Sequence, residues 1–160
     1  TPPPRERPVR MNYELALFTA VAVNPGWYPK VREALGGVSA IEELTDPYAK
    51  ELFLALEEWY RDGGSGIDDL LSRIGGNSLR NFVIEQGASE AFSSKIEQFE
   101  QFVSDGINRI KQKRLERRRA EIVMELRTIK EGEAGRRLED LLTEKVHIDG
   151  ELRRFKEVNV

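Results

Sequence analysis

The chain has 160 residues, and its 25 basic and 28 acidic side chains give a formal net charge of −3. This charge predicts no bulk attraction to nucleic acid or to an anionic membrane surface. The absence of Cys and the single His, His147, exclude disulfides, Cys nucleophiles and multi-His metal sites. No apolar run approaches the roughly 20 residues that span a bilayer, and no signal peptide opens the chain. We therefore expect a cytoplasmic protein without a membrane partner.

Residues 1–8 contain four prolines and three charged side chains. Proline fixes φ and has no amide donor, so this segment is expected to be an extended linker from a missing upstream domain. A frayed terminus is the alternative. The chain also opens without Met, which favours a fragment of a longer protein.

The next eighty residues contain helical patterns separated by proline and glycine turns, with no clean period-2 alternation. Asp46 and Pro47 are typical of an N-cap and first helical position, and Ser39 with Glu42 fits a capping box. In the helix after Pro47, one stripe is expected to be buried: Tyr48, Leu52, Leu56 and Trp59. The predicted short helices cover residues 11–23, 28–35, 40–44, 47–61, 67–74 and 77–87.

A long helix is predicted over residues 89–131, before a break at Gly132 and Gly135. Its core-facing stripe consists of Phe92, Ile96, Phe99, Val103, Ile107 and Ile110. At 1.5 Å per residue this helix is about 65 Å long, too long for a domain of this size to cover. Gly106 lies inside it, where glycine costs about 1 kcal/mol relative to alanine. Gly106 is a possible hinge, and a close helix crossing is the alternative.

Residues 136–157 form a second apolar face that predicts a helix folding back on residues 119–131. The two would make a helical hairpin with little core, and its exposed apolar flank is typical of a partner-binding surface. The expected fold is therefore all-α, with a multi-helix bundle over 9–108 and the end of the long helix plus a C-terminal hairpin over 109–160.

The sequence contains no credible catalytic site. Adjacent carboxylates on a helix point about 100° apart, and the glycines at 63–66 follow no strand and lack dinucleotide-loop spacing. His147 is the sole imidazole and is expected on the surface. We expect no catalytic residue, metal or cofactor in this fragment.

A basic run between Arg109 and Arg119 has seven cations and one acid, Glu116. Phosphate contacts by Arg114, Arg117 and Arg118 are one interpretation. A solvated helix that bridges two bodies is the alternative, because the cations surround the helix and no aromatic residue is interleaved.

Three segments resemble the C-terminal, helicase-interacting domain of bacterial replicative primase. They are YELALFTAVAVNPGW at 13–27, the helix after Asp46 and Pro47 with Leu52, Phe53 and Leu56, and LLTEKVHIDGELRRF at 141–155. The resemblance covers about residues 9–157. It implies that catalysis belongs to other primase domains and that this part docks on the N-terminal domains of the hexameric replicative helicase and stimulates it.

The resemblance implies binding through the terminal hairpin and stimulation by the globular body. The candidate contact residues, for binding or for hairpin packing, are Leu142, Val146, Ile148, Leu152 and Phe155. The N-terminal domain of the helicase has a similar fold and is an alternative identity. A nucleic-acid-binding module and a dimer of two hairpins are further alternatives. Alone, the chain is expected to be a monomer or a weak dimer.

Overall fold

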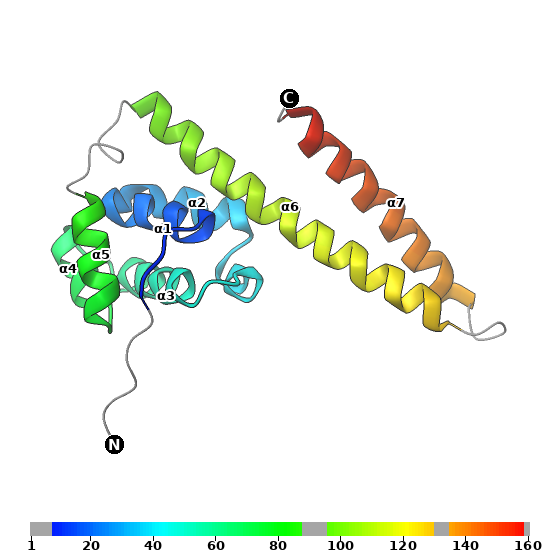
Figure 1. Cartoon of the computed structure of the whole chain (residues 1–160), viewed down its shortest axis with the longest axis horizontal. Helices are drawn as coiled ribbons and strands as arrows, with labels where there is room; N and C mark the ends of the chain where they lie inside the picture. The colour runs from blue at the N-terminus through cyan, green and yellow to red at the C-terminus, as the bar shows by residue number, and fades with distance from the viewer. Residues whose placement is uncertain (1–7, 88–95, 130–134, 159–160) are drawn as a thin grey trace, which may run out of the picture. The chain divides into compact units, whose positions relative to one another are not determined.

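The structure is a computed structural model that describes residues 8–87, 96–129 and 135–158. All regular structure in these ranges is helical, which confirms the all-α prediction (Figure 1). The elements are α1 (Tyr13–Val23), the 3-10 helix η1 (Pro25–Trp27), α2 (Tyr28–Leu35), the 3-10 helix η2 (Val38–Glu43), α3 (Pro47–Arg61), α4 (Gly66–Ser72), α5 (Asn77–Gly87), α6 (Ile96–Thr128) and α7 (Gly135–Val158).

The chain divides into two compact units, Thr1–Ile107 and Asn108–Val160. Helix α6 supplies its first turns to the first unit and its remaining turns to the second. Among the described helices, none is both long and apolar enough to cross a membrane.

Helix α1 is the central element of the first unit because it is buried on nearly all sides. Its fully buried apolar residues are Leu15, Leu17, Phe18, Ala20, Val21 and Ala22. Asn12 caps the helix by accepting a hydrogen bond from the Leu15 amide at 2.9 Å. Proline at position 25 follows its C-cap and cannot continue the α-helical hydrogen bonding.

Helix α3 begins as the sequence predicts, with the Asp46 carboxylate accepting from the Ala49 amide at 2.9 Å. Leu52 and Leu56 are fully buried, whereas Tyr48 and Trp59 at the two ends of the predicted stripe are half-buried. The Phe53 ring lies edge-on to Phe18, with ring centroids 5.1 Å apart, which joins α3 to α1.

Two carboxylates are buried among the described residues of this unit, and both accept several hydrogen bonds. Glu14 accepts hydrogen bonds from the backbone amides of Thr45, at 3.0 Å, and Asp46, at 2.8 Å, which joins α1 to the start of α3. Glu57 accepts from the Tyr28 hydroxyl, from Arg32 Nε at 2.9 Å and from Arg61 Nε at 2.9 Å. These partners compensate for the cost of burying each charge.

Burial opposes ionisation of Glu57, but the hydrogen bonds from Arg32, Tyr28 and Arg61 outweigh it and lower the Glu57 pKa to about 2. Burial, and then the hydrogen bond to Glu57, raise the pKa of Tyr28. The phenol therefore stays protonated and the carboxylate stays ionised at neutral pH. This cluster stabilises the fold by joining α2 to α3.

The first turns of α6 pack within the same unit. Phe99 and Val103 of the predicted stripe are buried, and the Phe99 ring lies 5.3 Å from that of Trp27. The helix continues without a break through Gly106, where a Cβ atom would lie 3.2 Å from the Leu17 side chain. Close packing thus accounts for the glycine, and the hinge stays a prediction.

The helix predicted after Ser39 is a 3-10 helix, and the prediction that Ser39 caps it is wrong. Residues Val38–Glu43 form a 3-10 helix that starts one residue before Ser39 and has Gly37 at its N-cap, so the Ser39 hydroxyl is not at a capping position. Gly36 and Gly37 both have positive φ, and Leu44 is already extended. The six residues between these turns form the tighter 3-10 helix, which proteins use in short pieces.

The long helix is also shorter than predicted at its C-terminal end. Helix α6 stops at Thr128, and its 33 described residues span about 50 Å. Its predicted start at Ser89, the stripe residue Phe92, and Gly132 of the predicted break lie outside the described residues, as do residues 1–7 of the predicted linker. Gly135 opens α7.

Candidate partner-binding hairpin

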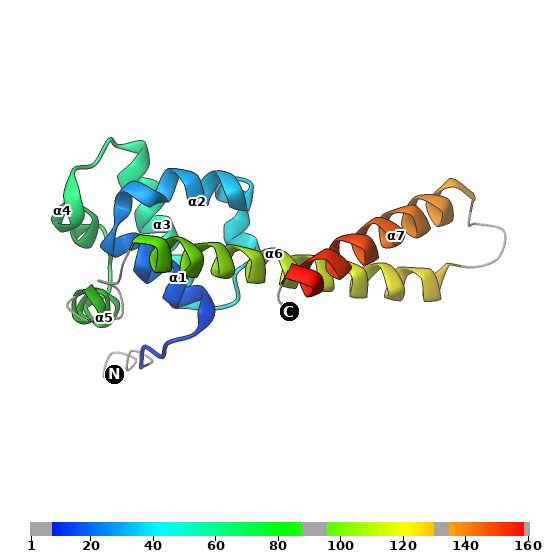
Figure 2. The same cartoon turned by 90° about the horizontal axis from the view of Figure 1, so that it is seen from above.

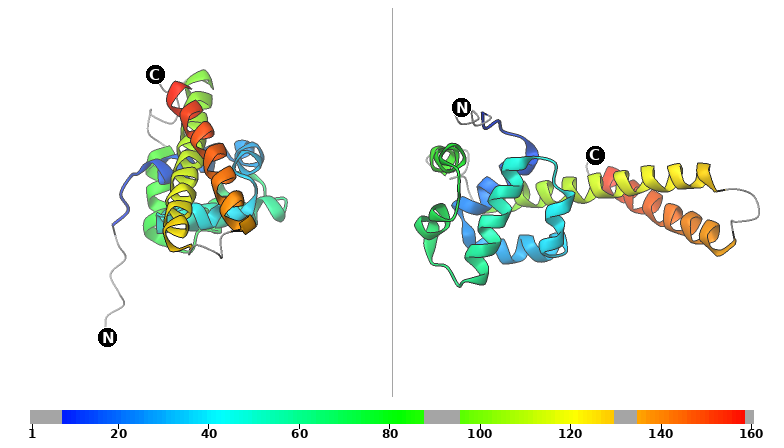
Figure 3. Two further views of the ribbon diagram at one scale, coloured as in Figure 1. Left: turned by 90° about the vertical axis from the view of Figure 1, so that its right-hand side faces the viewer. Right: turned by 90° about the horizontal axis from the view of Figure 1, so that it is seen from below.

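The second unit is an antiparallel pair of helices. From Asn108 onward, α6 runs alongside α7, which returns in the opposite direction (Figures 2 and 3). No proline follows Pro47 in the chain, so nothing in the sequence interrupts either helix. We call this unit the hairpin.

The hairpin has a small core. Ile122 of α6 packs with Leu141 and Ile148 of α7, and each of the three is at most 5% exposed. Four half-buried apolar side chains pack around them: Leu115, Leu126, Ile129 and Leu152. The spacing of seven between Leu141 and Ile148 keeps both on the face toward α6. The opposite faces of both helices are left without apolar cover from the hairpin itself.

Ion pairs join the two helices on either side of this core. Arg118 holds Glu144 through two hydrogen bonds of 2.7 and 2.9 Å, and Arg119 Nε lies 2.6 Å from Asp149 Oδ1. Near the end of α6 and the start of α7, Arg137 contacts Glu125 at 3.0 Å. All three pairs are at least partly exposed, so solvent and salt screen them and each contributes little to stability.

These contacts also set protonation states. The hydrogen bond from Arg118 lowers the pKa of Glu144, and hydrogen bonds from Lys145 and then Arg119 lower the pKa of Asp149. The hydrogen bond to Glu144 likewise raises the pKa of Arg118. The carboxylates of Glu144 and Asp149 therefore stay ionised to a lower pH than free carboxyl groups.

Large apolar side chains remain exposed on the outside of the hairpin. Leu142 is 46% exposed and Val146, one turn later on α7, is 72% exposed. Met124 of α6 is 60% exposed. Leu142 and Val146 share one face of α7 because they are four residues apart. We call these two residues the apolar pair.

The five predicted partner-binding residues therefore occupy different environments. Leu142 and Val146 are accessible, whereas Ile148 is 4% exposed and belongs to the hairpin core. Leu152 is half-buried against that core. Phe155 is half-buried beside a surface recess. Only the apolar pair presents large exposed area to another molecule.

The three arginines proposed to contact nucleic acid are also in different settings. Arg118 is joined to Glu144, and Arg117 is exposed. Arg114 lines the same recess as Phe155. The structure thus brings together two residues, Arg114 and Phe155, to which the sequence assigned separate roles.

Several residues of this unit were missed by sequence reasoning. Met124 has no local signal that distinguishes it from the apolar residues of the core stripe. Sequence reasoning also missed the partners of two arginines. Arg118 pairs with Glu144, 26 positions away, and Arg119 pairs with Asp149, 30 positions away. Only the register of the hairpin reveals these pairs. Lys111 and Arg154, which line the recess, also become neighbours only through that register.

The described residues hold no group of three or more His, Asp or Glu side chains that could bind a metal ion. The buried carboxylates of the first unit are hydrogen-bonded within the fold. The hairpin, with its exposed apolar and basic side chains, is therefore the candidate functional region.

Comparison with known proteins gives one informative similarity. The chain is 32% identical over 148 residues to the DNA primase of Treponema pallidum (strain Nichols), a match that covers 91% of this chain and 23% of that protein. No protein-family model and no solved structure matches the chain. The chain thus spans about a quarter of the length of the curated relative that it matches. It is a helical protein that resembles part of a DNA primase.

Proposed function

We propose that this chain is the helicase-binding part of a bacterial DNA primase. In this role it docks on the N-terminal domains of the hexameric replicative helicase and stimulates it, which couples primer synthesis to unwinding. Primer synthesis itself belongs to other parts of the primase. The similarity to a DNA primase favours this identity over the N-terminal domain of the helicase.

The observation that carries the proposal is the apolar pair on a hairpin with little core. Val146 is 72% exposed, although a β-branched apolar side chain gains nothing from water contact. Exposed apolar groups surrounded by charged residues mark protein-binding surfaces. The neighbouring side chains of Glu144 and Lys145 form ion pairs within the hairpin. The apolar pair, in contrast, has no such partner for its exposed surface and is therefore the group on this face that gains most from binding another protein.

The proposal is tested by helicase binding of the Leu142→Gln/Val146→Gln double variant. Glutamine is helix-compatible and both positions are exposed, so the hairpin stays folded. We expect the affinity for the helicase to fall at least tenfold in biolayer interferometry. The matched control, Leu54→Gln/Ile84→Gln, removes two side chains that are 52% and 49% exposed in the first unit. An equal loss in both variants would contradict docking through the hairpin.

The same surface also fits a second copy of the chain, since two apolar pairs can cover each other. Light scattering on the chain alone separates the two functions. A dimer that the Leu142→Gln/Val146→Gln change dissociates, together with unchanged helicase binding, would assign the apolar pair to self-association.

A further inference from the structure

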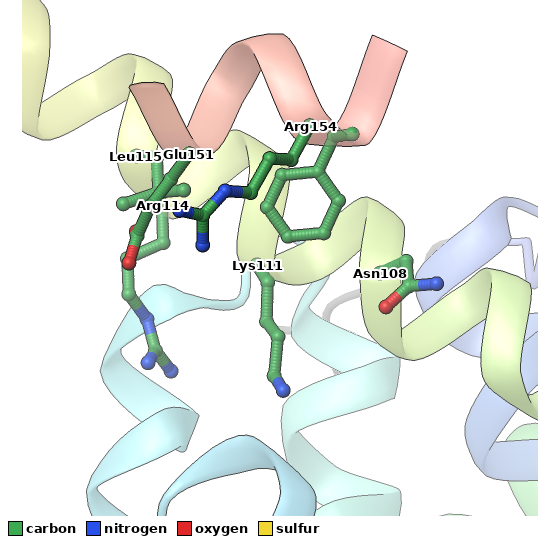
Figure 4. Close-up of a pocket in the computed structure, with 7 residues that line it drawn as sticks. Asn108, Lys111, Arg114, Leu115, Glu151 and Arg154 are labelled. Atoms are coloured by element: carbon green, nitrogen blue, oxygen red, sulfur yellow. The ribbon is translucent and has the colours of Figure 1, made fainter. Parts of the chain in front are cut away.

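A second surface of the hairpin, distinct from the apolar pair, is a recess of about 420 Å³. Both helices line it. Lys111 and Arg114 extend to the same side of α6, and Arg154 comes from α7 (Figure 4). Three cations around one recess, against the single carboxylate of Glu151, give it a positive potential.

Two of the three recess cations, Lys111 and Arg154, differ from the paired cations of the basic run. Arg118 and Arg119 are held by Glu144 and Asp149, and Lys113 lies 3.6 Å from Glu116. In the described part of the chain, neither Lys111 nor Arg154 makes an ion pair. Uncompensated positive charge is therefore available at the recess, where it can bind an anion at no cost to the hairpin.

Apolar groups form the remaining wall. Phe155 and Leu115 both line the recess, and Phe155 is not part of the hairpin core. An aromatic ring beside cations is the combination that binds nucleotides, because any base can stack on the ring while the cations hold the phosphates. Asn108 and Glu151 add hydrogen-bond acceptors that suit the amino and hydroxyl groups of a nucleotide.

We propose that this recess binds one nucleotide of a single-stranded nucleic acid. Lys111, Arg114 and Arg154 contact the phosphates, and the base stacks on Phe155. The volume of the recess suits one nucleotide. This activity is additional to helicase docking and does not depend on it, because the apolar pair takes no part in the recess.

The test is fluorescence anisotropy of a labelled thymidine 12-mer titrated with the whole chain between 50 and 200 mM NaCl, without helicase. Removing two phosphate contacts lowers the slope of log affinity against log salt by about 1.4, since each contributes roughly 0.7 on a single strand. We expect Lys111→Gln/Arg154→Gln to show that change and to bind at least tenfold more weakly. Phe155→Leu keeps the apolar volume but loses stacking, so it weakens binding about fivefold or more with an unchanged salt slope.

The matched control is Arg153→Gln/Lys156→Gln, which removes the same amount of charge from positions next to Arg154 on α7. Its two positions line a different recess, with Arg119 and Asp149. We expect its affinity to stay within threefold of the unaltered chain, and circular dichroism confirms that each variant is folded. Equal weakening by both charge variants, or no binding of the 12-mer at 50 mM NaCl, would overturn the proposal.

Two competitors identify the ligand class. Unlabelled thymidine 12-mer should displace the probe far better than either thymidine monophosphate or a peptide of twelve glutamates. Displacement by the monophosphate at equal nucleotide concentration would overturn the single-strand assignment in favour of a free nucleotide. Displacement by the glutamate peptide at equal charge would overturn base stacking in favour of an acidic protein segment.

Discussion

The first unit buries whole helices, whereas the hairpin buries one face of each of its two. Helix α1 has six fully buried apolar residues, whereas the core cluster of the hairpin has three buried side chains among the residues that the structure describes. The units also differ in charge: Thr1–Ile107 has ten basic and seventeen acidic residues, and Asn108–Val160 has fifteen and eleven. The first unit has a large core and an excess of acidic residues, whereas the hairpin has a small core and an excess of basic residues.

The largest expected effects come from cavities in the two cores. Phe53→Ala should lower the free energy of unfolding of the first unit by about 3–5 kcal/mol, and Ile122→Ala should cost the hairpin about 2–5 kcal/mol. Because the hairpin core is so small, we expect Ile122→Ala to release α7 while α1 stays protected. Hydrogen exchange, measured by mass spectrometry on peptides from α1 and α7, tests this expectation. Unchanged protection of the α7 amides would show that α7 stays bound to α6 without the hairpin core.

Acid should weaken the first unit through Glu57. Its folded pKa of about 2 is below the ordinary 4.5, so its contribution is complete above pH 4.5 and is lost as the pH falls toward 2. Between pH 6 and pH 3 this loss is about 2 kcal/mol. Urea unfolding at the two pH values should therefore show a larger decrease for the unaltered chain than for Glu57→Gln. Equal decreases would mean that Glu57 titrates normally.

Two helical glycines sharpen the comparison further. Gly150→Ala should stabilise the hairpin by up to about 1 kcal/mol, because nothing lies within 4 Å of the added methyl group. Gly106→Leu should destabilise the first unit by about 1–3 kcal/mol, because its side chain would enter the space of Leu17. Thermal melts of both variants test this, and a stabilising Gly106→Leu would contradict close packing at this position.

The smallest expected effect is that of the Arg118–Glu144 pair. A double-mutant cycle with Arg118→Met and Glu144→Gln should give a small favourable coupling energy that declines in 1 M salt. Because the pKa of Glu144 is lowered in the fold, the coupling should also disappear as acid protonates this carboxylate. A coupling that salt leaves unchanged would contradict an exposed ion pair.

Local sequence signals were sufficient for much of the fold. Asp46 and Pro47 marked the start of α3 correctly, and the apolar run after Met11 correctly indicated the buried helix α1. Ser39 and Glu42 have the spacing of a capping box, but the helix starts before Ser39 and has Gly37 at its N-cap. The spacing alone does not show where a helix begins. The backbone at Ser39 was decided by the two positive-φ glycines before it.

The candidate sites were harder to predict because they depend on the register between two helices. Periodicity placed Ile148 on the same apolar face as Leu152 but could not separate a core residue from exposed Val146. The recess combines Lys111 and Arg154, which are far apart in sequence and become neighbours only when α7 folds back. Side-chain spacing along one helix contains no information about the opposing one.

The central claim is that the hairpin docks on a replicative helicase, and size-exclusion chromatography with light scattering tests it most directly. The chain is run alone and then mixed with the hexameric replicative helicase of the organism that encodes it. We predict a monomer alone and a stable co-eluting complex in the mixture, which Leu142→Gln/Val146→Gln abolishes and Leu54→Gln/Ile84→Gln preserves. Separate elution of chain and helicase would contradict the account.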